Sequence, residues 1–344
     1  MDSLTQIVLG ASVGEAVCGK KIGNKAMVVG AIAGTIPDLD VLARPFQDMV
    51  QYLYYHRSIT HSLLFAFVLS PVFAWLTDKL LKDKRVSVKE WTWLFFLGFT
   101  THAALDCFTT WGTKVFYPFS AHPIAFHSIF VIDPLYTIPF IIFLLLSAFT
   151  RITNPMRTYY NQLGLIFSTV YLLVTLINKG IANKIFEKNL EAKGLTYQSY
   201  ISKPTPFNSI LWTATAKTET GYYSGFHSLL DNDHLVDYRF LPANHDLLND
   251  YLMHPKVKQL IEVTQGYYAV EKADKGVYIN DLRFGEFKGW GEQGRVFVFK
   301  YHIWKEGDEL KMDQINFRPA NVWEYLIPYW ERLKGNKQTA MTQD

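Results

Sequence analysis

Apolar and polar residues are arranged in two different ways along the chain, which divides it into two parts. The first part contains four long stretches with few charges, at residues 61–81, 91–112, 134–150 and 159–178. Each is long enough for a helix that crosses a bilayer once its flanks are counted. Two earlier runs, residues 4–14 and 26–37, are rich in glycine and alanine but shorter than the ~20 residues that a spanning helix needs. They are either helices whose carboxylates face the interior of a bundle or re-entrant segments.

The pattern changes after residue 186, where short stretches of strand-like alternation are separated by turn signals. The strands are expected at residues 266–269, 276–280 and 295–304. Residues 1–186 contain 15 Lys and Arg and 10 Asp and Glu, whereas residues 187–344 contain 19 and 21, the density of a soluble domain. The sequence therefore predicts an α-helical polytopic membrane domain over residues 1–186 and a soluble α+β domain over residues 187–344.

Basic residues indicate how the membrane domain is oriented. The loops at residues 20–25, 78–90 and 151–158 contain ten Lys and Arg, whereas the alternate loops at residues 43–60 and 113–130 contain three. The positive-inside rule places the basic loops in the cytoplasm and both termini outside. We therefore expect the C-terminal domain to be extracytoplasmic.

One short motif carries chemistry at the point where a polar loop becomes an uninterrupted apolar run. His56 and His61 lie on either side of Arg57 in this motif. A helix is expected to begin here, with Ser58 or Thr60 as its cap. The two imidazoles can bind the same ion or ligand only if it lies between them.

A second motif lies within a predicted span. His102 and Asp106 are four residues apart, so both lie on one face of a helix and can bind one ion. A carboxylate at the centre of a span costs roughly 2.5–3.5 kcal/mol on insertion scales, which makes Asp106 a functional candidate by default. The alternative is that Asp106 only accepts hydrogen bonds from Thr109, Thr110 or a neighbouring helix.

Carboxylates that end the first two apolar runs add to these motifs. We expect metal ligands at Asp38, Asp40, His56, His61, His102 and Asp106, and catalytic roles for Arg57 and Glu15. Nitrogen and oxygen ligands suit zinc first, with manganese and iron as alternatives. The set is large enough for two ions, which together would activate a water and hold a phosphoryl or acyl oxygen. Arg57 would bind a phosphate or another anion, unless it is an interfacial arginine that reaches toward lipid headgroups.

Four segments of the first part form an ordered set: MDSLT at residues 1–5, TIPDLD at 35–40, HRSITHS at 56–62 and HAALD at 102–106. Together they resemble the inner-membrane metal-dependent hydrolases of the YdjM type, a family with a LexA-regulated member. The resemblance covers roughly residues 1–150 and implies a multi-pass protein of the bacterial inner membrane with hydrolase activity. Many members have His at the position of Gln6, which implies one ligand fewer here or a different arrangement.

Three functions from different classes remain open. The first is a membrane-embedded metal-dependent hydrolase that acts on a phosphoester or lipid-linked substrate at the outer face of the membrane. The others are a transporter of a metal ion or small solute, and a membrane-anchored interaction protein with a structural metal. The sequence contains no nucleic-acid motif, so the expected partners are membrane lipids and a lipid-linked or phosphorylated substrate. It leaves the substrate and the oligomeric state undetermined.

Overall fold

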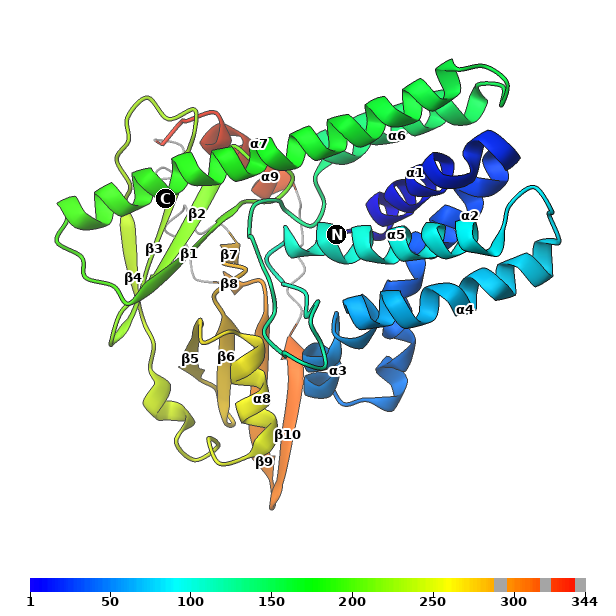
Figure 1. Cartoon of the computed structure of the whole chain (residues 1–344). Coiled ribbons are helices and arrows are strands. Elements are labelled where there is room, and N and C mark those ends of the chain that lie inside the picture. Colours follow the sequence, from blue (N-terminus) through cyan, green and yellow to red (C-terminus); the bar gives the residue numbers. More distant parts are fainter. Residues whose placement is uncertain (288–295, 316–322, 338–344) are drawn as a thin grey trace. The chain divides into compact units, whose positions relative to one another are not determined.

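The computed structural model describes residues 1–287, 296–315 and 323–337, and it divides into two compact units (Figure 1). Unit 1 comprises Met1–Pro45, Tyr55–Leu176 and Pro206–Asn208, and unit 2 comprises Phe46–Tyr54, Ile177–Thr205 and the described residues from Ser209 onward. Unit 1 is mainly helical, whereas unit 2 contains antiparallel sheets and helices. This confirms the predicted fold class of a helical membrane domain followed by an α+β domain.

The described elements up to residue 192 are helical. In chain order they are α1 (Ser3–Ile22), α2 (Asn24–Thr35), η1 (Ile36–Phe46), α3 (Met49–Tyr55), η2 (Ile59–His61), α4 (Leu63–Leu81), α5 (Val88–Cys107), α6 (Pro134–Phe149) and α7 (Met156–Ala192). Helices α4 to α7 correspond to the four long apolar stretches. By length and hydropathy, Asn24–Phe46, Leu63–Leu81 and Met156–Ala192 can cross a membrane, and Pro134–Phe149 is a shorter apolar helix.

Helix α7 belongs to both units. Its 37 residues correspond to a length of about 56 Å, nearly twice the ~30 Å hydrocarbon core of a bilayer. The unit boundary lies within it, between Leu176 and Ile177, whereas the boundary expected from the sequence lies further along the same helix. Part of α7 therefore extends beyond the hydrocarbon and continues into unit 2.

Glycines allow α1 and α2 to pack with their backbones in direct contact. A methyl group on Gly10 would overlap the carbonyl oxygen of Gly30, and one on Gly30 would overlap that of Gly10. The same holds for Gly14 against Ala26 and for Gly34 against Gln6. Four-residue spacing of glycine is typical of such close helix pairs in membranes. This packing places the C-terminal end of α2 beside the N-terminal half of α1.

The apolar helix α4 begins later than the sequence predicts. Residues 59–61 form the short 3-10 turn η2, and the side chain of Ser62 accepts a hydrogen bond from the amide of Phe65 at 3.0 Å. The prediction that Ser58 or Thr60 caps this helix is therefore wrong. Because η2 precedes α4, His61 lies in a turn just before the helix.

Unit 2 contains two four-stranded antiparallel sheets and a two-stranded ribbon. The first sheet has the order β1 (Ser199–Pro204), β2 (Leu211–Lys217), β3 (Gly221–Ser228) and β4 (Tyr238–Pro242). The second has the order β10 (Glu309–Ile315), β9 (Lys300–Glu306), β6 (Val277–Asp281) and β5 (Tyr268–Lys272), and β7 (Glu286–Phe287) pairs with β8 (Val296–Phe297). The helical elements are η3 (His245–Leu248), α8 (Pro255–Val263) and α9 (Trp323–Leu333). The strands predicted at residues 266–269 and 276–280 correspond to β5 and β6, whereas the stretch predicted at 295–304 contains β8 and the first part of β9, with residue 295 outside the described residues.

Unit 2 contains two buried charged side chains, Asp231 and Lys203, whose pKa values are both lowered but for different reasons. The carboxylate of Asp231 contacts Arg332 at 2.6 Å and His227 at 3.1 Å. Burial alone would raise the pKa of Asp231, but these contacts outweigh burial and hold the pKa well below its usual range. Lys203 is also buried, and burial lowers the pKa of its ammonium group to about 8 although Asp281 partly opposes this shift. Its ammonium group donates to the carbonyl of Phe284 at 2.7 Å.

Candidate metal centre

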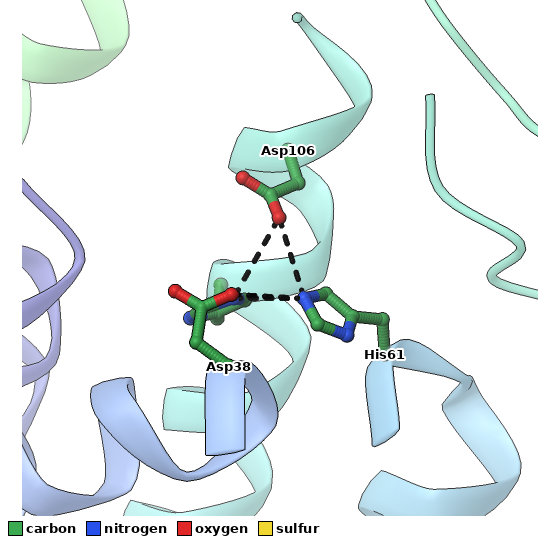
Figure 2. A group of neighbouring side chains, drawn as sticks. Asp38, His61 and Asp106 are labelled. Atoms are coloured by element: carbon green, nitrogen blue, oxygen red, sulfur yellow. Dashed lines mark hydrogen bonds and ion pairs between the residues drawn. The ribbon is translucent and has the colours of Figure 1, made fainter. Parts of the chain in front are cut away.

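Four predicted ligands converge in unit 1. Asp38 comes from η1, His61 from η2, and His102 and Asp106 from α5. Figure 2 shows Asp38, His61 and Asp106 directed toward one another. One ligand atom from each of the four side chains lies within 4.8 Å of the other three. The histidines and Asp106 are almost completely buried, whereas the side chain of Asp38 is 24% exposed.

Five of the six separations between these atoms are close to those of a tetrahedral metal site. The Nε2 atoms of His61 and His102 are 3.1 Å apart. Their distances to the Asp38 Oδ1 atom are 3.4 and 3.5 Å, and those to the Asp106 Oδ2 atom are 3.4 and 3.6 Å. A tetrahedral ion with bonds of ~2.0–2.1 Å has ligands about 3.3–3.4 Å apart. Both histidines are therefore placed to share an ion such as zinc with each carboxylate, and the two carboxylate oxygens lie within 4.8 Å of each other.

Hydrogen bonds to the other ring nitrogens favour the ligand form of the histidines. His102 Nδ1 lies 2.7 Å from the carbonyl oxygen of Gly34. A carbonyl can only accept, so Nδ1 carries the proton and the Nε2 atom of the neutral ring presents a lone pair. His61 Nδ1 lies 3.0 Å from the hydroxyl of Thr60. Such outer partners fix the orientation of histidines that bind metals.

The two carboxylate oxygens of Asp106 differ in their hydrogen bonds. Its Oδ1 atom accepts hydrogen bonds from the amino group of Met1 and from Gln6 Nε2, the latter at 3.0 Å. Its Oδ2 atom is buried and accepts no hydrogen bond from the described residues. A buried carboxylate oxygen without a donor is costly, and a cation at the centre would satisfy it. Gln6, at the position where the family resemblance implies His, thus orients a ligand.

Arg57 lies inside the protein beside this centre. Only 6% of the residue is exposed, and its φ of 58° is unusual for a residue other than glycine. Its Nε atom is 3.2 Å from Asp106 Oδ2, without the geometry of a hydrogen bond, and its Nη1 atom donates to Thr109 at 3.0 Å. The guanidinium is buried against Asp106, whereas the alternative interpretation expected Arg57 to reach toward lipid headgroups.

Asp40 and His56 form a pair next to the four converging ligands. His56 Nδ1 lies 3.1 Å from Asp40 Oδ2, which also accepts a hydrogen bond from the amide of Arg57 at 3.1 Å. The ring centroids of His56 and His61 are 6.4 Å apart. The structure therefore places this predicted pair beside the centre but not within the group of four.

Glu15 is not brought to the centre. Its carboxylate accepts hydrogen bonds from Arg157 Nε at 2.7 Å and from Arg157 Nη2 at 2.6 Å, and both side chains are buried. Along α1 it lies nine residues from Gln6, a distance of about 13 Å. The predicted catalytic carboxylate is thus engaged in an ion pair that the sequence analysis did not anticipate.

Comparison with known proteins shows the family of the chain. A family model described as YdjM inner membrane protein matches residues 1–182, which include all four converging ligands. The inner membrane protein YbcI of Escherichia coli (strain K12) is 28% identical over 113 residues, which are 33% of this chain and 63% of YbcI. No solved structure matches the chain. Since the family model covers more than half of its length, the chain belongs to the YdjM inner membrane protein family.

Proposed function

We propose that the protein is a metal-dependent hydrolase of the inner membrane that acts on a phosphoester or lipid-linked substrate at the outer face. The observation that carries the proposal is the convergence of Asp38, His61, His102 and Asp106 at separations suited to one ion. Zinc is the ion that this mixture of imidazole and carboxylate ligands suits first, with manganese and iron as alternatives. A divalent ion held there would polarise a phosphoryl or acyl oxygen and acidify a water molecule for attack.

Arg57 would hold the anionic part of the substrate. A guanidinium stays charged and offers five N–H donors in one plane. Within the described residues, its side chain contacts only Thr109 and Asp106, so donors remain for a phosphate oxygen. Its contact with Asp106 places these donors beside the centre. A positive group fixed there stabilises charge that develops during reaction.

The position of the ligands along α5 supports action at the outer face. His102 and Asp106 lie 14 and 18 residues after Val88, which corresponds to about 21 and 27 Å along the helix. The loop at the Val88 end is the basic loop of residues 78–90, which the positive-inside rule assigns to the cytoplasm. With a hydrocarbon core of ~30 Å, the centre would lie just below the outer headgroups. The same orientation makes unit 2 extracytoplasmic.

Two observations favour other functions. Four converging protein ligands are typical of a structural zinc site, whereas a catalytic site keeps one position for water or substrate. The partly exposed Asp38 is the ligand whose displacement would open such a position. A transporter is favoured by the change from α2 to η1 at Ile36, because broken helices form the ion sites of many transporters.

Metal content and hydrolysis measured on the same purified full chain distinguish these functions. We expect stoichiometric zinc by mass spectrometry and turnover of a phosphoester from a panel of soluble and lipid substrates. His102→Ala should weaken metal binding by more than the ~10–100-fold that is typical for an outer hydrogen-bond partner. His245→Ala, in unit 2, is the matched control. Full zinc occupancy without any hydrolysis would refute the enzyme, and flux of metal into liposomes would then identify a transporter.

A further inference from the structure

Access to the four ligands is uneven, and this indicates where a substrate would approach. The side chains of His61 and Asp106 are fully buried, and that of His102 is 1% exposed. Asp38, on η1, is the ligand with appreciable exposure. A molecule that reaches the centre must therefore pass η1.

The surface of η1 around Asp38 is apolar. Leu39 and Leu42 are 46% and 66% exposed, and Val41 between them is also exposed. Asp38 and Asp40 alternate with these residues, so one short helix presents both a metal ligand and an apolar surface. An exposed apolar patch beside a polar site is typical of a binding surface for an amphipathic molecule.

Two further segments next to the centre also expose apolar side chains. Ile59, between Arg57 and His61, is exposed. The loop that follows α5 is tied to the same region, because the amide of Lys114 donates to the carbonyl of Arg57 at 3.0 Å. This loop exposes Phe119. Three segments of unit 1 that contain or contact residues of the centre thus expose apolar side chains.

The charge of the centre complements an anion. The carboxylates of Asp38 and Asp106 balance a divalent ion, and Arg57 adds a positive charge that neither carboxylate would then offset. Asp40, 3.1 Å from His56 Nδ1, is a third carboxylate next to the four ligands, and the amino group of Met1 is a second positive group at Asp106. A phosphate or phosphodiester would neutralise Arg57, whereas a neutral headgroup would not.

We infer that the site binds a membrane lipid with an anionic phosphate headgroup, whose chains lie against Leu39, Val41 and Leu42 while the phosphate reaches the centre past Asp38. The inference rests on the proposed function because it identifies the substrate class of the same site. The lipid enters from the outer leaflet, where the chains remain in the hydrocarbon and the headgroup is at the depth of the ligands. A bilayer that only surrounds the protein would instead contact η1 and the other apolar helices alike.

Photo-crosslinking tests the binding surface independently of turnover. The full chain, loaded with zinc, is placed in vesicles of phosphatidylethanolamine and phosphatidylglycerol that contain a trace of a probe lipid, either phosphatidylglycerol or the phosphate-free diacylglycerol, with a diazirine on its acyl chain. We expect the phosphatidylglycerol probe to label the peptide with residues 39–42 more strongly than the diacylglycerol probe does, and Arg57→Gln to remove this preference. The peptide around Ile142 of α6, which is 51% exposed and far from any basic residue in the sequence, should show no preference. Equal labelling by both probes at η1 would overturn the inference.

Rates of hydrolysis show whether the lipid-binding inference or the proposed hydrolase function is wrong. The substrates are long-chain phosphatidylglycerol in vesicles and the dihexanoyl form, which has the same headgroup but dissolves in water. Leu42→Gln should lower the ratio of long-chain to short-chain turnover about tenfold, because it removes one apolar contact with the chain, whereas Leu80→Gln should not change it. Hydrolysis with an unchanged ratio and equal labelling would refute the lipid site and leave the hydrolase. Selective labelling at η1 without hydrolysis of any phosphoester would refute the hydrolase and leave the lipid site.

Discussion

The ion pair between Glu15 and Arg157 allows a sharp prediction about stability. The Arg157 side chain makes four polar contacts of 2.6 to 3.0 Å: two with Glu15, one with Asn24 and one with the carbonyl of Thr150. Both charged side chains are less than 5% exposed. Glu15→Gln would leave the guanidinium buried with neutral partners only. Removing one partner of a buried pair costs about 3–5 kcal/mol, so we expect the free energy of unfolding to fall by that amount.

The variant is measured by denaturant titration of the purified full chain in detergent micelles, with zinc content recorded on the same sample. Zinc content should equal that of the parent, because Glu15 is about 13 Å along α1 from the residue that contacts Asp106. Replacing both partners, Glu15→Met with Arg157→Leu, should recover most of the lost stability, since no unpaired charge remains. A Glu15→Gln protein of normal stability that has lost hydrolysis would refute this reasoning and support a catalytic role.

Three further predictions concern the centre, unit 2 and the topology. Arg57→Lys should keep its zinc but lose about 10²–10³-fold in hydrolysis rate, since a planar bidentate contact to the anion is lost; an unchanged rate would exclude the anion-binding role. The pKa of Lys203 is about 8 in the folded chain, against an ordinary value of 10.5 for a lysine in the unfolded chain. Between pH 8 and pH 10.5 Lys203 is therefore protonated in the unfolded chain and deprotonated in the folded one, so the free energy of unfolding should rise with pH. Hydrogen exchange of β1, corrected for intrinsic rates, should show this rise in the parent and not in Lys203→Met, and equal slopes would contradict it. A reporter fused after Asp344 should be active outside the cytoplasm, and cytoplasmic activity would reverse the orientation.

The sequence predicts the parts of the site that lie on one element better than those that depend on packing. His102 and Asp106 follow from helical spacing alone, since residues four apart share a face. Asp38 and His61 were identified as ligands by residue type, but their meeting with α5 depends on how three segments pack. The glycine spacing of α1 and α2 indicates that these two helices pack closely, but not that the carbonyl of Gly34 meets His102 of α5.

Other assignments could not be made from residue type. A carboxylate in an apolar run is a functional candidate whether it binds a metal or pairs with an arginine, and Arg157 lies 142 residues from Glu15. The sequence indicates Gln6 only as a departure from the family pattern and Thr109 only as a partner of Asp106 in the alternative interpretation, because neutral polar residues carry no distinctive spacing. Their contacts with Asp106 and Arg57 emerge only in three dimensions.

X-ray absorption spectroscopy of the zinc-loaded full chain tests the central claim most directly. The four side chains predict a first shell of nitrogen and oxygen alone, at ~2.0–2.1 Å, with the outer scattering of two imidazoles. In the double variant His61→Ala and His102→Ala, this imidazole scattering should disappear together with most of the zinc. A sulfur shell at ~2.3 Å, which would indicate Cys18 or Cys107, or full zinc occupancy in the double variant, would contradict the assignment.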